Sequence, residues 1–260
     1  MDDKRQAASD LLYTHWMNGT RIEDLPPELR PVDEAQGYAI QTLIERRSAE
    51  PLFGWKIAAT SAAGQAHIQV TNPLAGRLLS ERVLDDGGAC ALGANLMRVA
   101  ELEFAFRMGD TLAPRAEPYS PQEVLDRVAT LHPAIEIPDS RFDQFERVGA
   151  AQIVADNACA HYFLLGAASP PEWRALDLAA HAVLGIVNET EVHQGFGRNV
   201  LGDPRIALTW LVNRLSGLGI SLEAGQVVTT GTCVVPMAIK AGDRIRGDFG
   251  ELGTVSLSIV

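Results

Sequence analysis

Residues 96–106 read Leu-Met-Arg-Val-Ala-Glu-Leu-Glu-Phe-Ala-Phe, and this run alternates with the two-residue period of a β-strand. In a strand, Glu101 and Glu103 point to the same face, between the small or apolar neighbours Val99 and Ala105. The opposite face would carry Leu96, Arg98, Ala100, Leu102, Phe104 and Phe106. The run therefore predicts a strand that sends two carboxylates to one side and a mostly apolar surface to the other.

A third glutamate, Glu136, lies between Ile135 and Ile137 in a second strand-like run. Burying carboxylates among apolar residues costs several kcal/mol each unless a positive charge compensates. A hard divalent cation such as Mg²⁺ or Mn²⁺, which takes oxygen ligands, is the simplest compensation. The alternative is that Glu101 and Glu103 lie on a solvated strand face, where exposed glutamates are common.

Composition narrows the class of protein. The chain has 260 residues, of which 47% are hydrophobic and 21% charged, which is ordinary for a globular protein with a core. This length fits one large domain or a main domain with a small appendage. The net charge of −11 and the lack of basic runs beyond Arg46-Arg47 argue against binding to nucleic acid.

No apolar run has the length of a membrane span, and the acidic start of the chain does not resemble a signal peptide. Cys90, Cys159 and Cys233 are far apart, and their odd number favours neither a disulfide framework nor a zinc site. We therefore expect no membrane association and a reducing, cytoplasmic location. The loop glycines Gly195 and Gly197 lack the context of a dinucleotide fingerprint, so no nicotinamide cofactor is expected.

Hydrophobic periodicity and capping signals predict an α+β fold, with a smaller helical or mixed region over 1–90 and a β-rich core over 91–260. Helices are expected over 7–16, 33–44, 120–131, 152–161 and 204–215. A short helix followed by a loop is expected between 60 and 84. Strands are expected over 54–58, 97–108, 134–138, 181–189, 227–230, 235–239, 243–249 and 254–260.

Several motifs, in this order and spacing, resemble the 2-oxopent-4-enoate hydratase and 4-oxalocrotonate decarboxylase family of the fumarylacetoacetate hydrolase superfamily. The resemblance spans roughly residues 10–260. The motifs are Gly54-Trp-Lys-Ile57 with Thr60-Ser61, Glu101-Leu-Glu103-Phe-Ala-Phe106, Ala134-Ile-Glu-Ile137 with Asp139-Ser-Arg141, Ala155-Asp-Asn157, Val227-Val-Thr-Thr-Gly-Thr232, and Ala241-Gly-Asp243 with Gly250-Glu-Leu-Gly253.

The resemblance implies a mixed β-roll core that holds Mg²⁺ or Mn²⁺ through Glu101, Glu103 and Glu136. It also implies that Lys56 is an active-site lysine and that Thr232 lies near the substrate. Without it, Lys56 would be read as an exposed strand-edge lysine and Thr232 as a turn residue. Family members are homo-oligomers. One departure is Leu74, which stands where hydratases usually carry an acid.

A 2-oxo acid can chelate such a cation through its carboxylate and carbonyl oxygens, and the cation would polarise the carbonyl. A nearby cation should also lower the pKa of Lys56, which would suit proton transfer. The resemblance therefore implies a metal-dependent lyase that adds water to a small 2-hydroxydienoic or unsaturated 2-oxo acid from aromatic meta-cleavage catabolism. Two alternatives stay open: a 2-oxo acid decarboxylase of the same branch, and a weakly active metal-binding subunit that partners a paralogous enzyme. Arg141 is expected to form a structural pair with Asp139.

Overall fold

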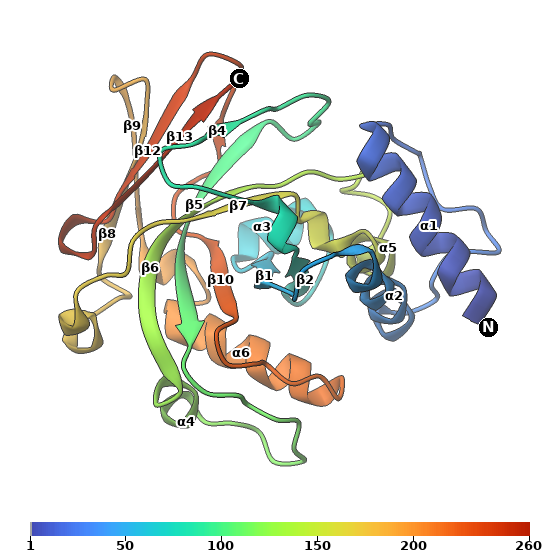
Figure 1. The fold of residues 1–260 in the computed structure, drawn as a ribbon, viewed down its shortest axis with the longest axis horizontal. Coiled ribbons are helices and arrows are strands. Elements are labelled where there is room, and N and C mark those ends of the chain that lie inside the picture. Colours follow the sequence, from blue (N-terminus) through green and yellow to red (C-terminus); the bar gives the residue numbers. More distant parts are fainter. Residues whose placement is uncertain (1) are drawn as a thin grey trace.

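The computed structural model describes residues 2–260, which form an α+β fold with one large and one smaller β-sheet (Figure 1). The strand order of the large sheet is β2 (Leu74–Leu78), β1 (Gly54–Ala58), β10 (Val227–Thr232), β5 (Val99–Met108), β6 (Val128–Ile137), β7 (Tyr162–Leu165) and β3 (Val83–Leu84), and β11 (Met237–Ala238) also pairs with β5. The order of the smaller sheet is β4 (Ala89–Cys90), β13 (Thr254–Ile259), β12 (Arg244–Asp248), β8 (Ala182–Val187) and β9 (Glu191–Phe196).

Helices flank the large sheet. The α-helices are α1 (Asp2–Asn18), α2 (Glu34–Gln41), α3 (Ala62–His67), α4 (Pro121–Leu125), α5 (Ala150–Ala155) and α6 (Pro204–Gly217). Short 3-10 helices are η1 (Thr42–Arg47), η2 (Ser80–Arg82), η3 (Asn157–Cys159), η4 (Pro171–Ala175), η5 (Gly197–Asn199) and η6 (Gly250–Leu252). In Figure 1, α1, α2 and α5 lie together at one side of the molecule and the smaller sheet lies at the other. Within residues 2–260, no helix is long and apolar enough to cross a bilayer.

Strand β5 joins the two sheets through its apolar face. The side chains of Leu102 and Phe104 are fully buried, and the Phe104 ring packs edge-on against Phe249 with 5.2 Å between ring centroids. The backbones of Gly185 and Gly247 in the smaller sheet approach Leu102 so closely that an added Cβ would lie 3.2 and 3.0 Å from its methyl groups. Burial of each such side chain stabilises the fold by about 1.5–3 kcal/mol. Because side chains alternate along β5, this packing turns the glutamates to the other face.

Most of the expected elements are present. The helices predicted over 7–16, 33–44 and 204–215 correspond to α1, to α2 with η1, and to α6, and Asp33 caps α2 by accepting from the backbone of Gln36. The α+β class is confirmed. The boundary between 1–90 and 91–260 stays a prediction, while β1 and β2 from the first part pair within the same sheet as β10 and β5.

Two predicted helices are shorter than expected. The helix that begins at the Ser120 capping box ends at Leu125, because the following residues pair with β5 as the ten-residue strand β6. The helix predicted over 152–161 ends at Ala155, because Asn157, Ala158 and Cys159 all adopt positive φ angles.

Strands β2, β7 and β9 were not predicted. Gly195 belongs to β9 rather than to a loop, and an added Cβ there would lie 1.8 Å from the carbonyl oxygen of Cys233. This glycine therefore permits a close approach of two backbone segments, which the sequence pattern does not distinguish from a turn.

Candidate metal centre

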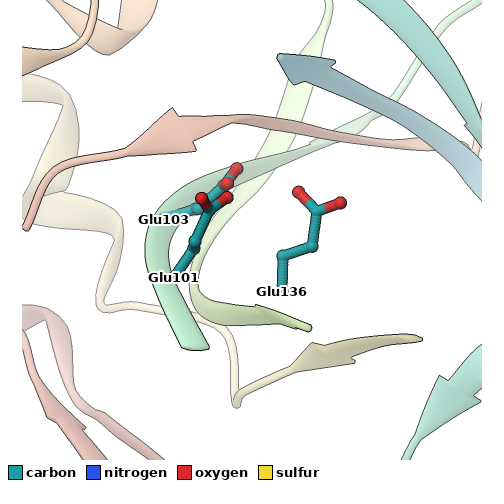
Figure 2. Close-up of side chains that lie close together, drawn as sticks. All are labelled: Glu101, Glu103 and Glu136. Carbon is teal, nitrogen blue, oxygen red and sulfur yellow. The ribbon is translucent and has the colours of Figure 1, made fainter. Parts of the chain in front are cut away.

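Three glutamate side chains converge from two neighbouring strands. In the antiparallel pair β5–β6, Glu101 lies directly opposite Glu136, and Glu103 lies two residues further along β5. Residues directly opposite in an antiparallel pair point to the same face, with their Cβ atoms about 4.5–5.5 Å apart. One carboxylate oxygen from each glutamate lies within 4.8 Å of the others. Figure 2 shows the three side chains close together. The structure thus brings together all three residues that the sequence analysis selected as metal ligands.

Two groups of β10, one side-chain hydroxyl and one backbone N–H, hydrogen-bond to one of these carboxylates. Thr229 and the backbone N–H of Gly231 both donate hydrogen bonds to Oε2 of Glu103, the latter over 2.6 Å. A register shift between Thr229 and Thr232 aims this N–H at the carboxylate, and Gly231 has a φ of +98°, a conformation that suits glycine. An added Cβ would lie 2.0 Å from the hydroxyl oxygen of Thr60. Glu103 is therefore locked in one orientation.

Lys56 supplies a positive charge to the glutamate cluster. Its side chain is 3% exposed, its Nζ lies 3.1 Å from Oε1 of Glu136, and it donates a hydrogen bond of 3.1 Å to the carbonyl oxygen of Ala158. The structure contradicts the alternative of an exposed strand-edge lysine. An ammonium group has three N–H donors, so the hydrogen bond to Ala158 leaves donors for further oxygens.

The electrostatics of the cluster are unbalanced. Burial raises the pKa of the Glu101 carboxyl to about 7, repulsion from Glu136 adds to the shift, and Lys56 opposes it. Burial likewise raises the pKa of Glu103, where repulsion from Glu136 and Glu101 adds, and that of Glu136, where Lys56 opposes. Burial acts to lower the pKa of Lys56, but the attraction of Glu136, then Glu101 and Glu103, outweighs it and raises this pKa. The sequence analysis expected a lowered pKa for Lys56 in a site that holds a cation. The raised pKa described here belongs to the site without one.

The donor set fits a hard divalent cation. Three carboxylates and one ammonium group carry a net charge of −2 when all are ionised, which one divalent ion cancels. Among residues 2–260, no hydrogen-bond donor reaches Oε1 of Glu103 or Oε2 of Glu136, although both atoms are buried. Buried polar atoms without partners are rare and costly. Oxygen-only ligands are those that Mg²⁺ and Mn²⁺ prefer.

A cavity of about 540 Å³ opens beside the cluster. Glu101, Lys56 and Thr232 line it, whereas Glu103 and Glu136 are fully buried behind Glu101. The Thr232 hydroxyl donates to the carbonyl oxygen of Val234, so its lone pairs remain free to accept a hydrogen bond. Thr232 thus lines the cavity, and its proximity to a substrate stays a prediction.

A left-handed turn positions the carbonyl that Lys56 contacts. Asn157, Ala158 and Cys159 have φ angles of 56°, 49° and 61°, a region that costs roughly 1–2 kcal/mol for each non-glycine residue. The Asn157 side chain holds the turn against β2 by accepting from the backbone N–H of Arg77 over 2.6 Å and donating to its carbonyl oxygen over 2.8 Å. An added Cβ at Gly76 would lie 2.4 Å from the Asn157 carbonyl oxygen.

Two expectations about neighbouring residues change. Arg141 pairs with the carboxylate of Asp156, which also accepts from Ser140, whereas the carboxylate of Asp139 pairs with Arg21. The expected Arg141–Asp139 charge pair is therefore wrong, although Arg141 does donate to the backbone carbonyl of Asp139. Leu74, which stands where an acid was expected, is fully buried in the core and does not line the cavity.

A family model described as the C-terminal region of fumarylacetoacetate (FAA) hydrolase matches residues 46–260. The chain belongs to this family. It is 32% identical over 254 residues to 2-keto-4-pentenoate hydratase 1 of Dechloromonas aromatica, which covers 96% of this chain and 95% of that protein. It is 29% identical over 230 residues to a 4-oxalocrotonate decarboxylase of a Pseudomonas species, with 88% and 86% of the two chains covered.

The FAA hydrolase fold is also shared with a solved structure. The 4-oxalocrotonate decarboxylase from Pseudomonas putida G7, complexed with magnesium and adipate, superposes with a TM-score of 0.90 at 25% identity and covers 100% of this chain and 98% of that chain. The match confirms the family resemblance and the fold class that the sequence indicated. At about 30% identity, the relatives leave open whether this member hydrates or decarboxylates its substrate.

Replacing Glu101 by Gln should lower the affinity for Mg²⁺ or Mn²⁺ at least 100-fold, because it removes one charged oxygen ligand. The stability of the metal-free protein should not fall, since the variant also relieves repulsion with Glu136. Calorimetric titration with each ion measures the affinity. The exposed Glu117→Gln variant is the control and should bind as wild type does. Wild-type affinity in Glu101→Gln would contradict the assignment.

The part of the metal-free protein's stability that depends on Glu101 should fall as the pH rises from about 4.5 to about 7. A carboxyl with a raised pKa in the folded state binds more protons when folded, so the free energy of unfolding falls as pH rises toward about 7 and stays low above it. His161, whose pKa burial lowers to about 3, acts with the opposite sign but only below its usual value near 6.5. Denaturant unfolding in chelator measures the effect. In Glu101→Gln, the free energy of unfolding should lack this fall with rising pH. If wild type and variant change equally with pH, this carboxyl is not the source of the effect.

Replacing Asn157 by Ala should lower the free energy of unfolding by about 2–4 kcal/mol, because it leaves two buried backbone groups of Arg77 without partners. Denaturant unfolding measures this loss. The exposed Asn72→Ala variant is the matched control and should stay within about 0.5 kcal/mol of wild type. Equal stability of the two variants would mean that the turn does not depend on the Asn157 side chain.

Proposed function

We propose that this protein is a Mg²⁺- or Mn²⁺-dependent lyase that adds water to a small 2-hydroxydienoic or unsaturated 2-oxo acid, with Glu101, Glu103 and Glu136 as the metal ligands. The observation that carries the proposal is the buried glutamate cluster with one ammonium group at the wall of a cavity. Relatives named 2-keto-4-pentenoate hydratases, which align over most of the chain, support it.

The reaction needs an electron-poor carbon and controlled proton transfer. A divalent cation, when bound, supplies Lewis-acid polarisation of the 2-oxo group. A 2-hydroxydienoic acid first loses its hydroxyl proton and gains a proton at C5, which gives the 2-oxo acid with a C3=C4 double bond. The hydroxyl group of water then bonds to C4 and a proton is delivered to C3, so that one water molecule is consumed and nothing leaves. Lys56 donates one hydrogen bond to Ala158 and forms an ion pair with Glu136, so a further N–H donor is suited to hold a substrate oxygen or to exchange a proton at the cavity wall.

Thr232 and the glutamates complete the part of the site that we assign to the reacting atoms. The lone pairs of Thr232 Oγ1 can accept a hydrogen bond from a water molecule in the cavity, because its own proton is donated to Val234. The hydrogen bonds from Thr229 and Gly231 keep Glu103 from rotating. These fixed partners reduce the reorganisation that the reaction requires.

A decarboxylase of the same branch is the second candidate function. The similarity to 4-oxalocrotonate decarboxylases in sequence and in fold favours it. In that reaction, a C–C bond to a carboxylate breaks, CO₂ leaves, and a proton takes its place. As part of the proposal, the chain forms a homo-oligomer or associates with a paralogous decarboxylase or hydratase, in which case its own activity could be low. Light scattering of the purified chain, alone and with such a paralogue, tests this assembly.

The two activities can be measured side by side. Ultraviolet absorbance follows the loss of 2-hydroxypenta-2,4-dienoate with added Mg²⁺, and CO₂ release follows the decarboxylation of 4-oxalocrotonate. We expect metal-dependent loss of the dienoate and little CO₂. The opposite result would favour the decarboxylase, and metal binding without either activity would favour the partner subunit.

Replacing Lys56 by Met should lower turnover at least tenfold, which corresponds to about 1.4 kcal/mol in the barrier, and leave metal affinity within about threefold of wild type. Methionine keeps the length of the buried stem and removes the N–H donors. The exposed Lys240→Met variant is the control for the loss of one positive charge. Wild-type turnover in Lys56→Met would remove Lys56 from the mechanism.

A further inference from the structure

Most of the residues that line the cavity are apolar. Ile68 at the end of α3, Phe145, and Ile153 in α5 are buried side chains that line it, together with Met97 and Val234. A wall of this kind binds hydrocarbon and repels charge. The wall therefore indicates that the part of the substrate that does not react is apolar.

Charged groups line the cavity only beside the glutamate cluster. Among the residues that the structure describes, the charged side chains that line it are Lys56 and Glu101, and no arginine does. Lys56 already contacts Glu136 and Ala158. His67 is the remaining basic group; it is exposed, and its ring packs edge-on against Phe145. A second carboxylate at the far end of a substrate would thus lose its water without gaining a buried cationic partner.

The cavity is also larger than a five-carbon acid needs. Such a 2-oxo acid has eight non-hydrogen atoms and, at no more than about 30 Å³ for each water-sized group, fills at most roughly 240 Å³. The cavity measures about 540 Å³. Roughly 300 Å³ is left over by this comparison, part of which the cation and its water ligands would fill.

We propose, on the basis of the proposed function, that the substrate is a monocarboxylic 2-oxo acid whose apolar tail extends at least three carbons beyond a five-carbon acid. The wall formed by Ile68, Met97, Phe145 and Ile153 selects this tail and excludes tails that end in a carboxylate. Added methylene groups strengthen binding because they leave water for an apolar surface.

Binding of saturated 2-oxo acids tests the inference separately from turnover. The probes are 2-oxopentanoate, 2-oxohexanoate, 2-oxooctanoate and the diacid 2-oxooctanedioate, each titrated by calorimetry against the full chain with saturating Mg²⁺. We expect affinity to rise about fourfold for each methylene, or roughly 60-fold from five to eight carbons. The diacid should bind at least 100-fold more weakly than 2-oxooctanoate.

A charge placed in the wall should reverse the discrimination. Met97→Lys should reduce the ratio of the affinities for 2-oxooctanoate and for the diacid at least tenfold, because the lysine gives the second carboxylate a cationic partner. Leu96→Lys adds the same charge at the neighbouring exposed residue, which does not line the cavity, and should leave this ratio unchanged. Affinity that stays flat or falls with tail length, or tighter binding of the diacid, would overturn the inference. Loss of hydratase activity with the binding preference intact would instead count against the proposed function alone.

Discussion

The register of β5 against β6 places two glutamates directly opposite each other inside the protein. Like charges in that position destabilise a sheet, and Glu103 adds a third carboxylate on the same face. Lys56 offsets one of the three charges, and Thr229 and Gly231 hydrogen-bond to one oxygen of Glu103. Within residues 2–260, Lys56 is the one cationic side chain that lowers the pKa of these carboxyls, so the rest of the charge is uncompensated there. Such an arrangement is costly for stability alone and is understandable if the site binds a cation.

The surroundings of the cluster show how the chain maintains this arrangement. The left-handed turn at Asn157–Cys159 is an unfavourable backbone conformation for non-glycine residues, whereas the irregular stretch of β10 uses glycine at position 231 for its positive φ angle. The Asn157 side chain ties the turn to Arg77, and Thr60 lies where a side chain at position 231 would have to fit. Strain of this kind persists only where the surrounding structure enforces it, and it concentrates at functional sites. Each of the two segments hydrogen-bonds to a different residue of the site. The backbone N–H of Gly231 donates to Glu103, and the carbonyl oxygen of Ala158 accepts from Lys56.

Local patterns predicted the glutamate cluster better than they predicted the residues around it. Alternation alone showed that Glu101 and Glu103 share a face, because strand geometry depends on neighbours in sequence. Glu136 was noticed as a carboxylate between two isoleucines, but its place opposite Glu101 depends on strand pairing across a long stretch of chain. The family resemblance was needed to add Lys56. Thr229 and Asn157 stand in motifs that carry the resemblance, but these motifs do not reveal their partners. A threonine in a strand and an asparagine after a helix are ordinary, and only tertiary contacts give them their roles. For the same reason, pairing with β5 overrode the helical pattern at 128–131.

The glutamate cluster does not by itself decide which reaction the protein performs, because relatives named for hydration and for decarboxylation align over most of the same chain. The difference must come from groups that contact the remainder of the substrate. Leu74 cannot supply it here, because its side chain lies in the core rather than in the cavity. A decarboxylase acting on a diacid has to bind a second carboxylate, and the basic groups available for it are Lys56, which is already engaged, and the exposed His67. The apolar wall therefore weighs toward addition of water, since that reaction requires no second charge in the cavity.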